Sequence, residues 1–369
     1  MSTVLVRKAS YDYAVLKPLV FEMMDLFCRD AIKAGSRVLI KPNLLLPAAP
    51  DRAIVTHPLI VRASAEYALD RGAKVRISDS NAMGSFEKVI AESGLKDALR
   101  GMDVELSELK ASTLVDVGEP FKKIEIAKDA LEADVVVNLP KLKTHVQMRM
   151  TLGVKNLFGC IVGLRKPEWH FRTGVNREMF AKLLVKIHQA INPAVTIMDG
   201  ILCLEGEGPG KSGDPRPLGV MMASDNTFAL DSVACTMVGM NPDSLFTIKA
   251  AGEMGLMPET IEVMGELPAV HDFKFPDMVP LVFGPKPLHG FMRRRLVQRP
   301  AQDLKLCKLC GECWKYCPAK AISRSGKKLV FDYEECIRCY CCIEVCPHAA
   351  MKTEEPMLGR LFKRVKKNS

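Results

Sequence analysis

The sequence predicts an α/β protein with a mostly parallel sheet and flanking helices, followed by a small α+β module that is rich in cysteine. Two observations lead to this fold class. Over residues 1–287, short β-rich runs alternate with helical stretches, a pattern typical of parallel sheets with helical crossovers. Nine of the 13 cysteines lie between Cys307 and Cys346, which sets the end of the chain apart from the rest.

Five β-rich runs of the N-terminal domain end in polar residues. The runs are SRVLI, KVRIS, ADVVV, AVTIM and LGVMMAS, which begin at residues 36, 74, 133, 194 and 218. In open α/β sheets, ligands bind at the carboxyl ends of the strands. We therefore expect the residues that follow these runs to converge on one crevice.

A cluster of cations follows the third run. NLPKLKTH, residues 138–145, holds Lys141, Lys143 and His145. Farther on, Lys155 and Asn156 lie in the apolar, glycine-punctuated segment MTLGVKNLFG. A lysine in such a segment is either exposed at a helix edge or buried with a partner, and a bound anion is a suitable partner. The glycine-rich EGEGPGKSGDP lacks the spacing of a phosphate-binding or dinucleotide-binding loop, and is more typical of a flexible surface loop.

These positions give a candidate site for a substrate with a carboxylate or phosphate group. Lysines would clamp the anion and stabilise charge that develops during reaction, and histidines would donate protons. We expect catalytic roles for His145, His170, Lys141 and Lys143. We expect substrate binding by Lys41, Asn43, Lys155, Asn156, Asp199, Glu205 and Asp231. The three carboxylates of this set could orient the cations or bind a metal together with His145.

The cysteine-rich module contains an internal repeat. CKLCGECWKYCP from Cys307 and CIRCYCCIEVCP from Cys336 both read C-x2-C-x2-C-x3-C-P. With this spacing, three cysteines of one repeat and the last cysteine of the other hold one 4Fe-4S cluster. The predicted ligand sets are Cys307, Cys310, Cys313 and Cys346 for one cluster, and Cys336, Cys339, Cys342 and Cys317 for the other. Cys341 is surplus to this pattern, and structural zinc is the alternative to two clusters.

Composition and charge narrow the range of partners. A formal net charge of +9 suits an acidic small molecule, an acidic protein or an anionic membrane surface. Because the aromatic content is only 6% and no nucleic-acid-binding motif is present, we expect no nucleic-acid partner. No apolar stretch approaches the roughly 18 residues of a transmembrane helix. The N-terminus lacks the features of a secretory signal, so we expect a cytoplasmic location.

Two segments near the module are basic. We expect a linker over residues 288–302, between the α/β domain (1–287) and the module (303–352), and a tail over residues 353–369. The tail PMLGRLFKRVKKNS could lie on a membrane surface. Short basic ends more often dock on their own domain or fray, and we favour that interpretation.

A resemblance to a known family rests on several blocks of sequence. KPNLL at residue 41, NLPKLKTH at 138, MTLGVKNLFG at 150, MDGILCLEGEGP at 198 and ALDSVA at 229 resemble blocks of the family known as domain of unknown function 362. Members are often fused to a two-cluster module, and the cysteine repeat resembles bacterial two-cluster ferredoxins. The resemblance implies an iron–sulfur protein with an α/β fold, but it does not imply a substrate.

We therefore expect a ferredoxin-dependent reductase that passes electrons through two 4Fe-4S clusters to an anionic small molecule at the strand ends. Its donor would be an acidic low-potential carrier, such as a ferredoxin or flavodoxin, attracted by the lysine-rich module. One alternative is an electron-transfer or binding subunit that docks on a partner redox protein. Another is a non-redox enzyme whose clusters have a structural or sensing role.

Overall fold

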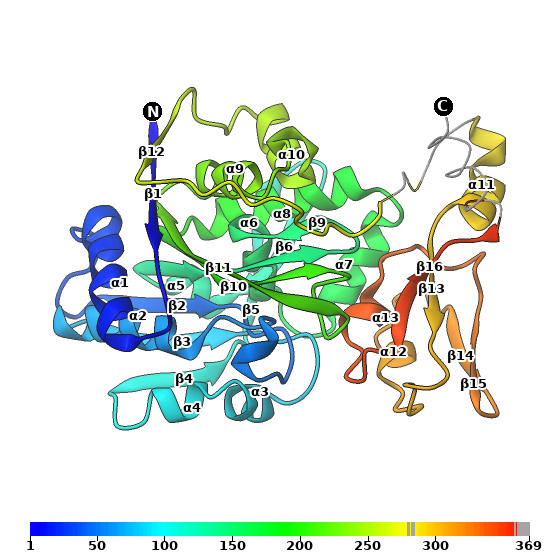
Figure 1. Cartoon of the computed structure of the whole chain (residues 1–369), viewed down its shortest axis with the longest axis horizontal. Coiled ribbons are helices and arrows are strands. Elements are labelled where there is room, and N and C mark those ends of the chain that lie inside the picture. The colour runs from blue at the N-terminus through cyan, green and yellow to red at the C-terminus, as the bar shows by residue number, and fades with distance from the viewer. Residues whose placement is uncertain (279–280, 282–284, 358, 360–369) are drawn as a thin grey trace.

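The computed structural model describes residues 1–278, 281, 285–357 and 359. Over these residues the N-terminal domain is built on a ten-stranded sheet with the order β12-β1-β11-β10-β7-β2-β3-β4, in which β8 pairs with β10 and β9 with β8 (Figure 1). The strands are β1 (Ser2–Lys8), β2 (Arg37–Pro42), β3 (Lys74–Asp79), β4 (Val104–Glu108), β7 (Val135–Leu139), β8 (Lys141–His145), β9 (Arg149–Thr151), β10 (Val195–Gly206), β11 (Gly213–Ser224) and β12 (Ile261–Met264).

Most of the sheet is parallel, as the alternating sequence pattern predicts. Strands β10, β7, β2, β3 and β4 run in the same direction. One of the five predicted runs, LGVMMAS, lies in β11 and is not parallel to the strand beside it. Strand β11 folds back antiparallel on β10 through the glycine-rich segment between Gly206 and Gly213. Asp225, which follows β11, therefore leaves the sheet at the opposite edge from the residues that follow the parallel strands.

Helices cover both faces of the sheet. They are α1 (Tyr13–Cys28), α2 (Pro58–Asp70), α3 (Phe86–Glu92), α4 (Leu95–Ala98), α5 (Lys128–Glu132), α6 (Gly153–Asn156), α7 (Arg165–Thr173), α8 (Arg177–Ile191), α9 (Thr227–Met237) and α10 (Phe246–Glu253), with short 3-10 turns at Pro50–Arg52, Leu157–Cys160, Pro242–Ser244 and Lys286–Leu288. A hairpin of β5 (Ser112–Gly118) and β6 (Lys122–Ala127) packs beside α8.

Alternation along the central strands divides the core into two. Leu39, Val136 and Met198 belong to the core that contains α8 and α9. Their neighbours Ile40 and Val137 belong to the core that contains α1 and α2. Successive side chains of a strand point to opposite faces, so a sheet buried on both sides reads as a continuous apolar run. This explains why runs such as VVV and VLI were recognisable as strands.

The C-terminal module holds two small antiparallel sheets and two one-turn helices. Its elements are β13 (Arg299–Gln302) paired with β16 (Met351–Glu354), β14 (Ile322–Ser325) paired with β15 (Lys328–Phe331), α12 (Glu312–Lys315) and α13 (Cys341–Glu344). The predicted linker 288–302 contains α11 (His289–Leu296) and β13, so its last residues pair within the module. Of the predicted basic tail, residues 358 and 360–369 lie outside the described residues.

The module packs on the α/β domain beside α7 and the tip of the β10–β11 hairpin (Figure 1). Thr353 Oγ1 donates to Glu207 Oε2 over 2.8 Å, and Val146 packs into the apolar core of the module with Tyr340 and Ile343. In the part of the chain that the structure describes, no helix combines the length and the apolar character needed to cross a membrane.

Candidate functional site

A cavity lies where the α/β domain meets the module. The centre of a water molecule can occupy about 70 Å³ of it, and about 10–15 Å³ of such space holds one water. The cavity therefore has room for a small molecule. Its polar lining from the α/β domain is Lys41, Asn43, Asp79, Ser80, Lys143, Thr151, Lys155, Asn156, Lys166 and His170. The module contributes Tyr316, Cys341, Glu344 and Val345.

Two of the cavity lysines, Lys41 on β2 and Lys143 on β8, are engaged by acceptors within the protein. Lys41 is buried and lies 2.8 Å from Asp79 Oδ1, with a further bond to the Pro42 carbonyl. Lys143 donates to Asn43 Oδ1 and to the Ile54 carbonyl, each over 2.8 Å. The ion pair neutralises the charge of Lys41, whereas Lys143 has only neutral acceptors. Lys143 therefore leaves more positive potential in the cavity.

Buried amides hold these groups in place. Asn43 Nδ2 donates to Asn156 Oδ1 over 2.9 Å, and Asn156 Nδ2 donates to Asn138 Oδ1 over 2.8 Å. A methyl group at Gly159 would overlap both Asp79 Oδ1 and Lys41 Nζ, so only glycine allows that turn to approach the ion pair. The site is therefore braced by groups whose hydrogen bonds are satisfied within the protein.

Asp231 holds the start of α6, the helix that carries two of the cavity residues. Its carboxylate accepts from the backbone N–H groups of Gly153 over 2.7 Å and Val154 over 3.0 Å, at the start of α6. Burial raises the pKa of Asp231 to about 7, and these two hydrogen bonds oppose the shift. Because α6 carries Lys155 and Asn156, Asp231 positions cavity residues and does not line the cavity itself.

Lys155 is the cavity lysine with an unsatisfied charge. Its side chain is buried beside the Phe158 ring, and its Nζ makes no hydrogen bond or ion pair with any described residue. Burial lowers the pKa of Lys155, while the charges of Glu344 and Cys341 oppose that shift. Thr151 Oγ1 and His170 Nδ1 are also buried without a hydrogen-bond partner among the described residues. Buried polar groups require partners, so these groups are available to a molecule in the cavity.

Burial places the pKa of two other lysines close to neutrality. The pKa of Lys143 is lowered to about 7 and that of Lys166 to about 8, in each case mainly by desolvation. Lys166, which donates to the Ser80 carbonyl and hydroxyl over 2.6 and 2.8 Å, was not singled out from the sequence. Its only signal was its place in the LRKPEWH segment after Lys155.

The two predicted histidines are both buried and neutral near pH 7. Burial lowers the pKa of His170 to about 3, and burial together with Lys155 lowers that of His145 well below its usual range. His145 Nδ1 accepts from Gln147 N, and its Nε2 lies 3.7 Å from Glu344 Oε2. His145 is therefore at the domain junction rather than in the cavity lining. These placements favour Lys143 and Lys166 as the groups that change protonation near neutrality.

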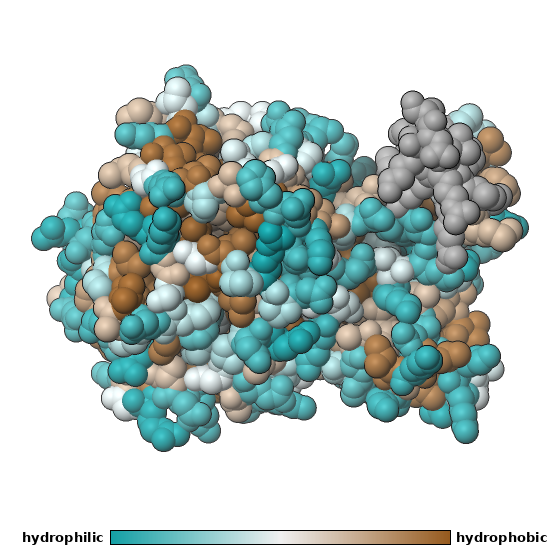
Figure 2. Space-filling view, viewed as in Figure 1, coloured by the Kyte–Doolittle hydropathy of each residue, from teal (hydrophilic) through white to brown (hydrophobic). Residues whose placement is uncertain are grey.

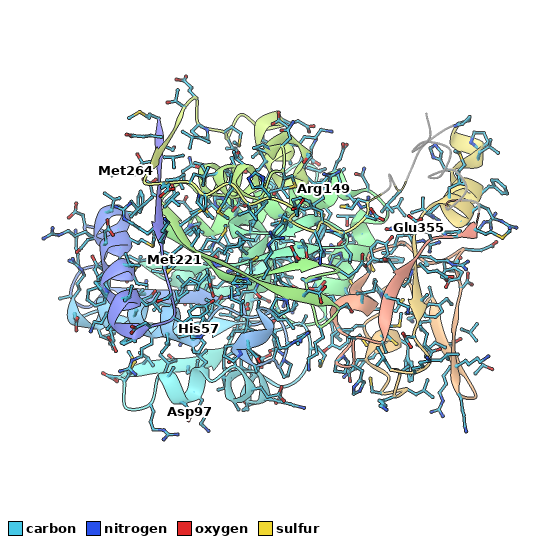
Figure 3. The ribbon with its side chains drawn as sticks, in the orientation of Figure 1. His57, Asp97, Arg149, Met221, Met264 and Glu355 are labelled. Carbon is cyan, nitrogen blue, oxygen red and sulfur yellow. The ribbon has the colours of Figure 1, made fainter. Side chains whose placement is uncertain are left out.

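The remaining predicted residues lie outside the cavity lining. Lys141 pairs with Asp199 over 2.8 Å, and Tyr11 bonds to both. The Tyr11 ring stacks on that of His57, whose place in the fold is labelled in Figure 3. Glu205 pairs with Arg216 on the β10–β11 hairpin. The structure thus separates the carboxylates that sequence reasoning grouped with His145. Among the described residues, no three His, Cys, Asp or Glu side chains form a group that could hold a single metal ion.

The eight predicted cluster ligands fall into two groups of four. Cys307, Cys310, Cys313 and Cys346 line one small cavity, and Cys317, Cys336, Cys339 and Cys342 line another. Backbone N–H groups point at their sulfurs: Ala321 N lies 3.3 Å from Cys317 Sγ, and Ala350 N lies 3.3 Å from Cys346 Sγ. Such donors stabilise thiolates that bind iron–sulfur clusters, so the residues present fit two clusters.

Cys341 lies between the cysteine site and the cationic cavity. It lines the cavity of Cys317, Cys336, Cys339 and Cys342, and it also lines the cavity that contains Lys155. Gly210 of the glycine-rich segment packs closely against α13, the helix that carries Cys341 and Glu344. A methyl group at Gly210 would lie only 2.8 Å from the Glu344 carbonyl oxygen. The segment that resembled a flexible loop in the sequence is therefore packed between the two domains.

Comparison with known proteins agrees with this architecture. Residues 299–347 match the family model described as a 4Fe-4S dicluster domain, so the module binds two 4Fe-4S clusters, which supply one-electron transfer. Residues 38–236, more than half of the 369 residues, match the family described as domain of unknown function (DUF362). The chain belongs to this family.

Individual relatives extend the comparison. The chain is 37% identical over 279 residues to Thylakoid-associated protein sll1697 of Synechocystis sp., a match that covers 73% of this chain and 87% of that protein. It is 39% identical over 57 residues to Pyruvate synthase subunit PorD of Thermotoga maritima, covering 15% of this chain and 58% of that protein. Among solved structures, the lactate racemase apoprotein from Thermoanaerobacterium thermosaccharolyticum aligns with a TM-score of 0.36 and 14% identity, over 54% of this chain and 50% of that chain.

Proposed function

We propose that this protein is an iron–sulfur oxidoreductase that exchanges electrons with an anionic small molecule bound in the cationic cavity. One observation carries the proposal: Cys341 lines both the cavity of the second cysteine group and the cavity that contains Lys155. A bound molecule would therefore be separated from one cluster by little more than a side chain.

The charges of the cavity support an anionic ligand. Lys41 is neutralised by Asp79, which leaves Lys143, Lys155 and Lys166 opposite Glu344. When they are protonated, these three lysines face a single carboxylate. Such a site suits a carboxylate or a phosphate, because charged donors bind both groups strongly. Leu45, Phe158, Pro167, Pro209 and Tyr316 form apolar walls around this polar base. The walls favour an organic anion with an apolar or conjugated body.

The donor is proposed to be an acidic low-potential carrier such as a ferredoxin or flavodoxin. The net charge of +9 would attract such a protein. We also propose a cytoplasmic location, because none of the 13 cysteines, all of which the structure describes, forms a disulfide, and this suits a compartment in which thiols stay reduced.

The substitution Lys155→Met tests the cavity. It removes the unpaired charge while keeping the length of the side chain. We expect binding of inorganic phosphate or benzoate, measured by calorimetry under anaerobic conditions, to weaken about 10- to 100-fold, since a charged hydrogen bond contributes about 1.5–3 kcal/mol. The same change should abolish the oxidation of reduced viologen by unsaturated carboxylates or organic phosphates that the unmodified protein accepts.

The matched control is Lys110→Met, because the Lys110 side chain is 78% exposed and does not line the cavity. Both variants should retain about eight iron atoms per chain. If Lys155→Met binds and turns over the same anions as the unmodified protein with its clusters intact, the cavity is not the substrate site.

A second candidate function is that of an electron-transfer subunit. Leu304, Leu306 and Val330 of the module are 56%, 47% and 49% exposed, and hydrophobic residues reach the surface of the module in Figure 2. The module is also similar to a protein named as a subunit of pyruvate synthase. Purification from native lysate should then yield a stoichiometric redox partner. Turnover of a small molecule by the isolated monomer would favour the oxidoreductase instead.

A further inference from the structure

The two cluster-binding repeats differ at one buried position. Leu309 and Arg338 each precede the second cysteine of their repeat, and both adopt left-handed backbone with φ of 54° and 59°. The two loops therefore share a left-handed residue at the same position of the repeat. One carries an aliphatic side chain and the other a permanently charged guanidinium.

Arg338 is buried without a compensating carboxylate. The residue is 0% exposed, and its Nη1 donates to the Cys336 carbonyl over 3.4 Å. Its guanidinium also lies over the Tyr333 ring, at 5.2 Å from the centroid. Nε and Nη2 have no hydrogen-bond partner among the described residues, and no described carboxylate forms an ion pair with it. A buried unpaired charge is strongly unfavourable unless something nearby compensates it.

The adjacent cluster is the group that can compensate this charge. A 4Fe-4S cluster with four thiolate ligands is anionic, and reduction adds one more negative charge. Hydrogen bonds to the sulfurs and net local charge are known determinants of cluster potential. A fixed cation beside Cys336 should therefore stabilise the reduced state.

We propose that Arg338 raises the reduction potential of the cluster held by Cys317, Cys336, Cys339 and Cys342 above that of the other cluster. Two effects oppose this one. Burial of the cysteine group disfavours added negative charge, and the Glu344 carboxylate lies close to Cys339 and Cys341. Glu344, however, also faces the charges of Lys143 and Lys155, which offset it. No described carboxylate pairs with Arg338, and the only described contacts of its guanidinium are with the Cys336 carbonyl and the Tyr333 ring.

The consequence is a direction for electron flow within the module. Cys310 of the other group is exposed, so that cluster is the accessible one. The cluster beside Arg338 shares Cys341 with the cationic cavity. Electrons would therefore move from the accessible cluster to the one next to the cavity. That destination rests on the proposed function, whereas the order of the two potentials does not.

The test is a potentiometric titration of the full-length protein, followed by electron paramagnetic resonance without substrate. We expect two separate midpoint potentials in the unmodified protein. Arg338→Gln should lower the higher one by at least about 59 mV, which corresponds to about a tenfold change in the reduced-to-oxidised ratio for one electron. Arg338→Lys, which keeps the charge, should retain most of the separation.

Two further variants complete the test. Leu309→Arg should raise the lower potential and narrow the gap, because it places the same charge in the equivalent loop. Arg324→Gln removes an exposed arginine from the β14–β15 hairpin and should leave both potentials unchanged.

The proposal is overturned if Arg338→Gln, with its iron content intact, shifts neither potential more than Arg324→Gln does. If Arg338→Gln loses iron, Leu309→Arg and Arg338→Lys decide the matter. Unchanged potentials in Leu309→Arg, or a collapsed gap in Arg338→Lys, then refute it. Undiminished anion binding and turnover in Lys155→Met, with normal potentials, would instead refute only the proposed function.

Discussion

At the scale of single residues, burial controls the protonation states of the lysines in the cavity. Lys143 and Lys166 lie in a cavity where desolvation lowers the pKa values to about 7 and 8. Both groups are fully protonated only below those values. Since a lysine binds an anion best as an ammonium ion, the cavity should lose affinity as the pH rises.

Sulfate provides a direct test, because its own charge does not change between pH 6 and 9. We expect its affinity to fall through pH 7 and again through pH 8, by up to about tenfold per pH unit for each lysine above its pKa. Lys143→Met should bind sulfate more weakly at pH 6 and show a flatter profile around pH 7. Calorimetry at four pH values measures both effects. An affinity independent of pH would contradict the assignment.

At the scale of elements, the short helix α6 depends on a residue far away in the sequence. A helix of four residues is not stable alone, because its first turn leaves backbone N–H groups without partners. Asp231 on α9 accepts from two of these groups, Gly153 N and Val154 N. The blocks MTLGVKNLFG and ALDSVA are thus connected by a structural contact.

Replacement of Asp231 should therefore affect both stability and binding. Asp231→Ala leaves two buried N–H groups unsatisfied, at about 1–3 kcal/mol each. We expect a lower melting temperature and at least tenfold weaker phosphate binding, with cluster content unchanged. Asp225→Ala, at an exposed position two residues before the same helix, is the matched control. Unaltered phosphate affinity in Asp231→Ala would show that α6 does not depend on this contact.

At the scale of the whole molecule, the cavity exists only when the module is docked. Val146 of the α/β domain is buried in the apolar core of the module, next to Tyr340 and Ile343. Glu344 and Cys341 complete the cavity from the module side. Separation of the two domains would therefore open the site to solvent without removing a single cluster ligand.

Val146→Asp should cause such a separation, because it buries an unpaired charge in the junction. We expect a larger radius of gyration by small-angle scattering and faster proteolysis near residues 288–302. Iron should remain at about eight atoms per chain, while phosphate binding is lost. Val330→Asp, at a half-exposed position of the module, should retain the compact form. Undiminished phosphate binding in a separated Val146→Asp protein would place the anion site elsewhere.

The sequence by itself determined the features that depend on local pattern. Apolar runs identified the strands, because burial on both faces requires continuous hydrophobic residues. Cysteine spacing predicted two clusters, because a tight loop must present three thiolates to one cluster. Lys41, Asn43, Lys143, Lys155 and Asn156 were predicted as substrate or catalytic residues, and the structure places all of them in the lining of one cavity.

Only the tertiary structure decided which other residues join them. Lys141 and Lys143 are two apart on β8 and would share a face in a regular strand. The register of β8 against β10 shifts between Asp199 and Leu204, and Lys141 pairs with Asp199 outside the cavity. Cys341 and Glu344 reach the cavity because the module docks there. Such docking depends on surface shape and buried contacts between distant segments, which no local sequence pattern encodes.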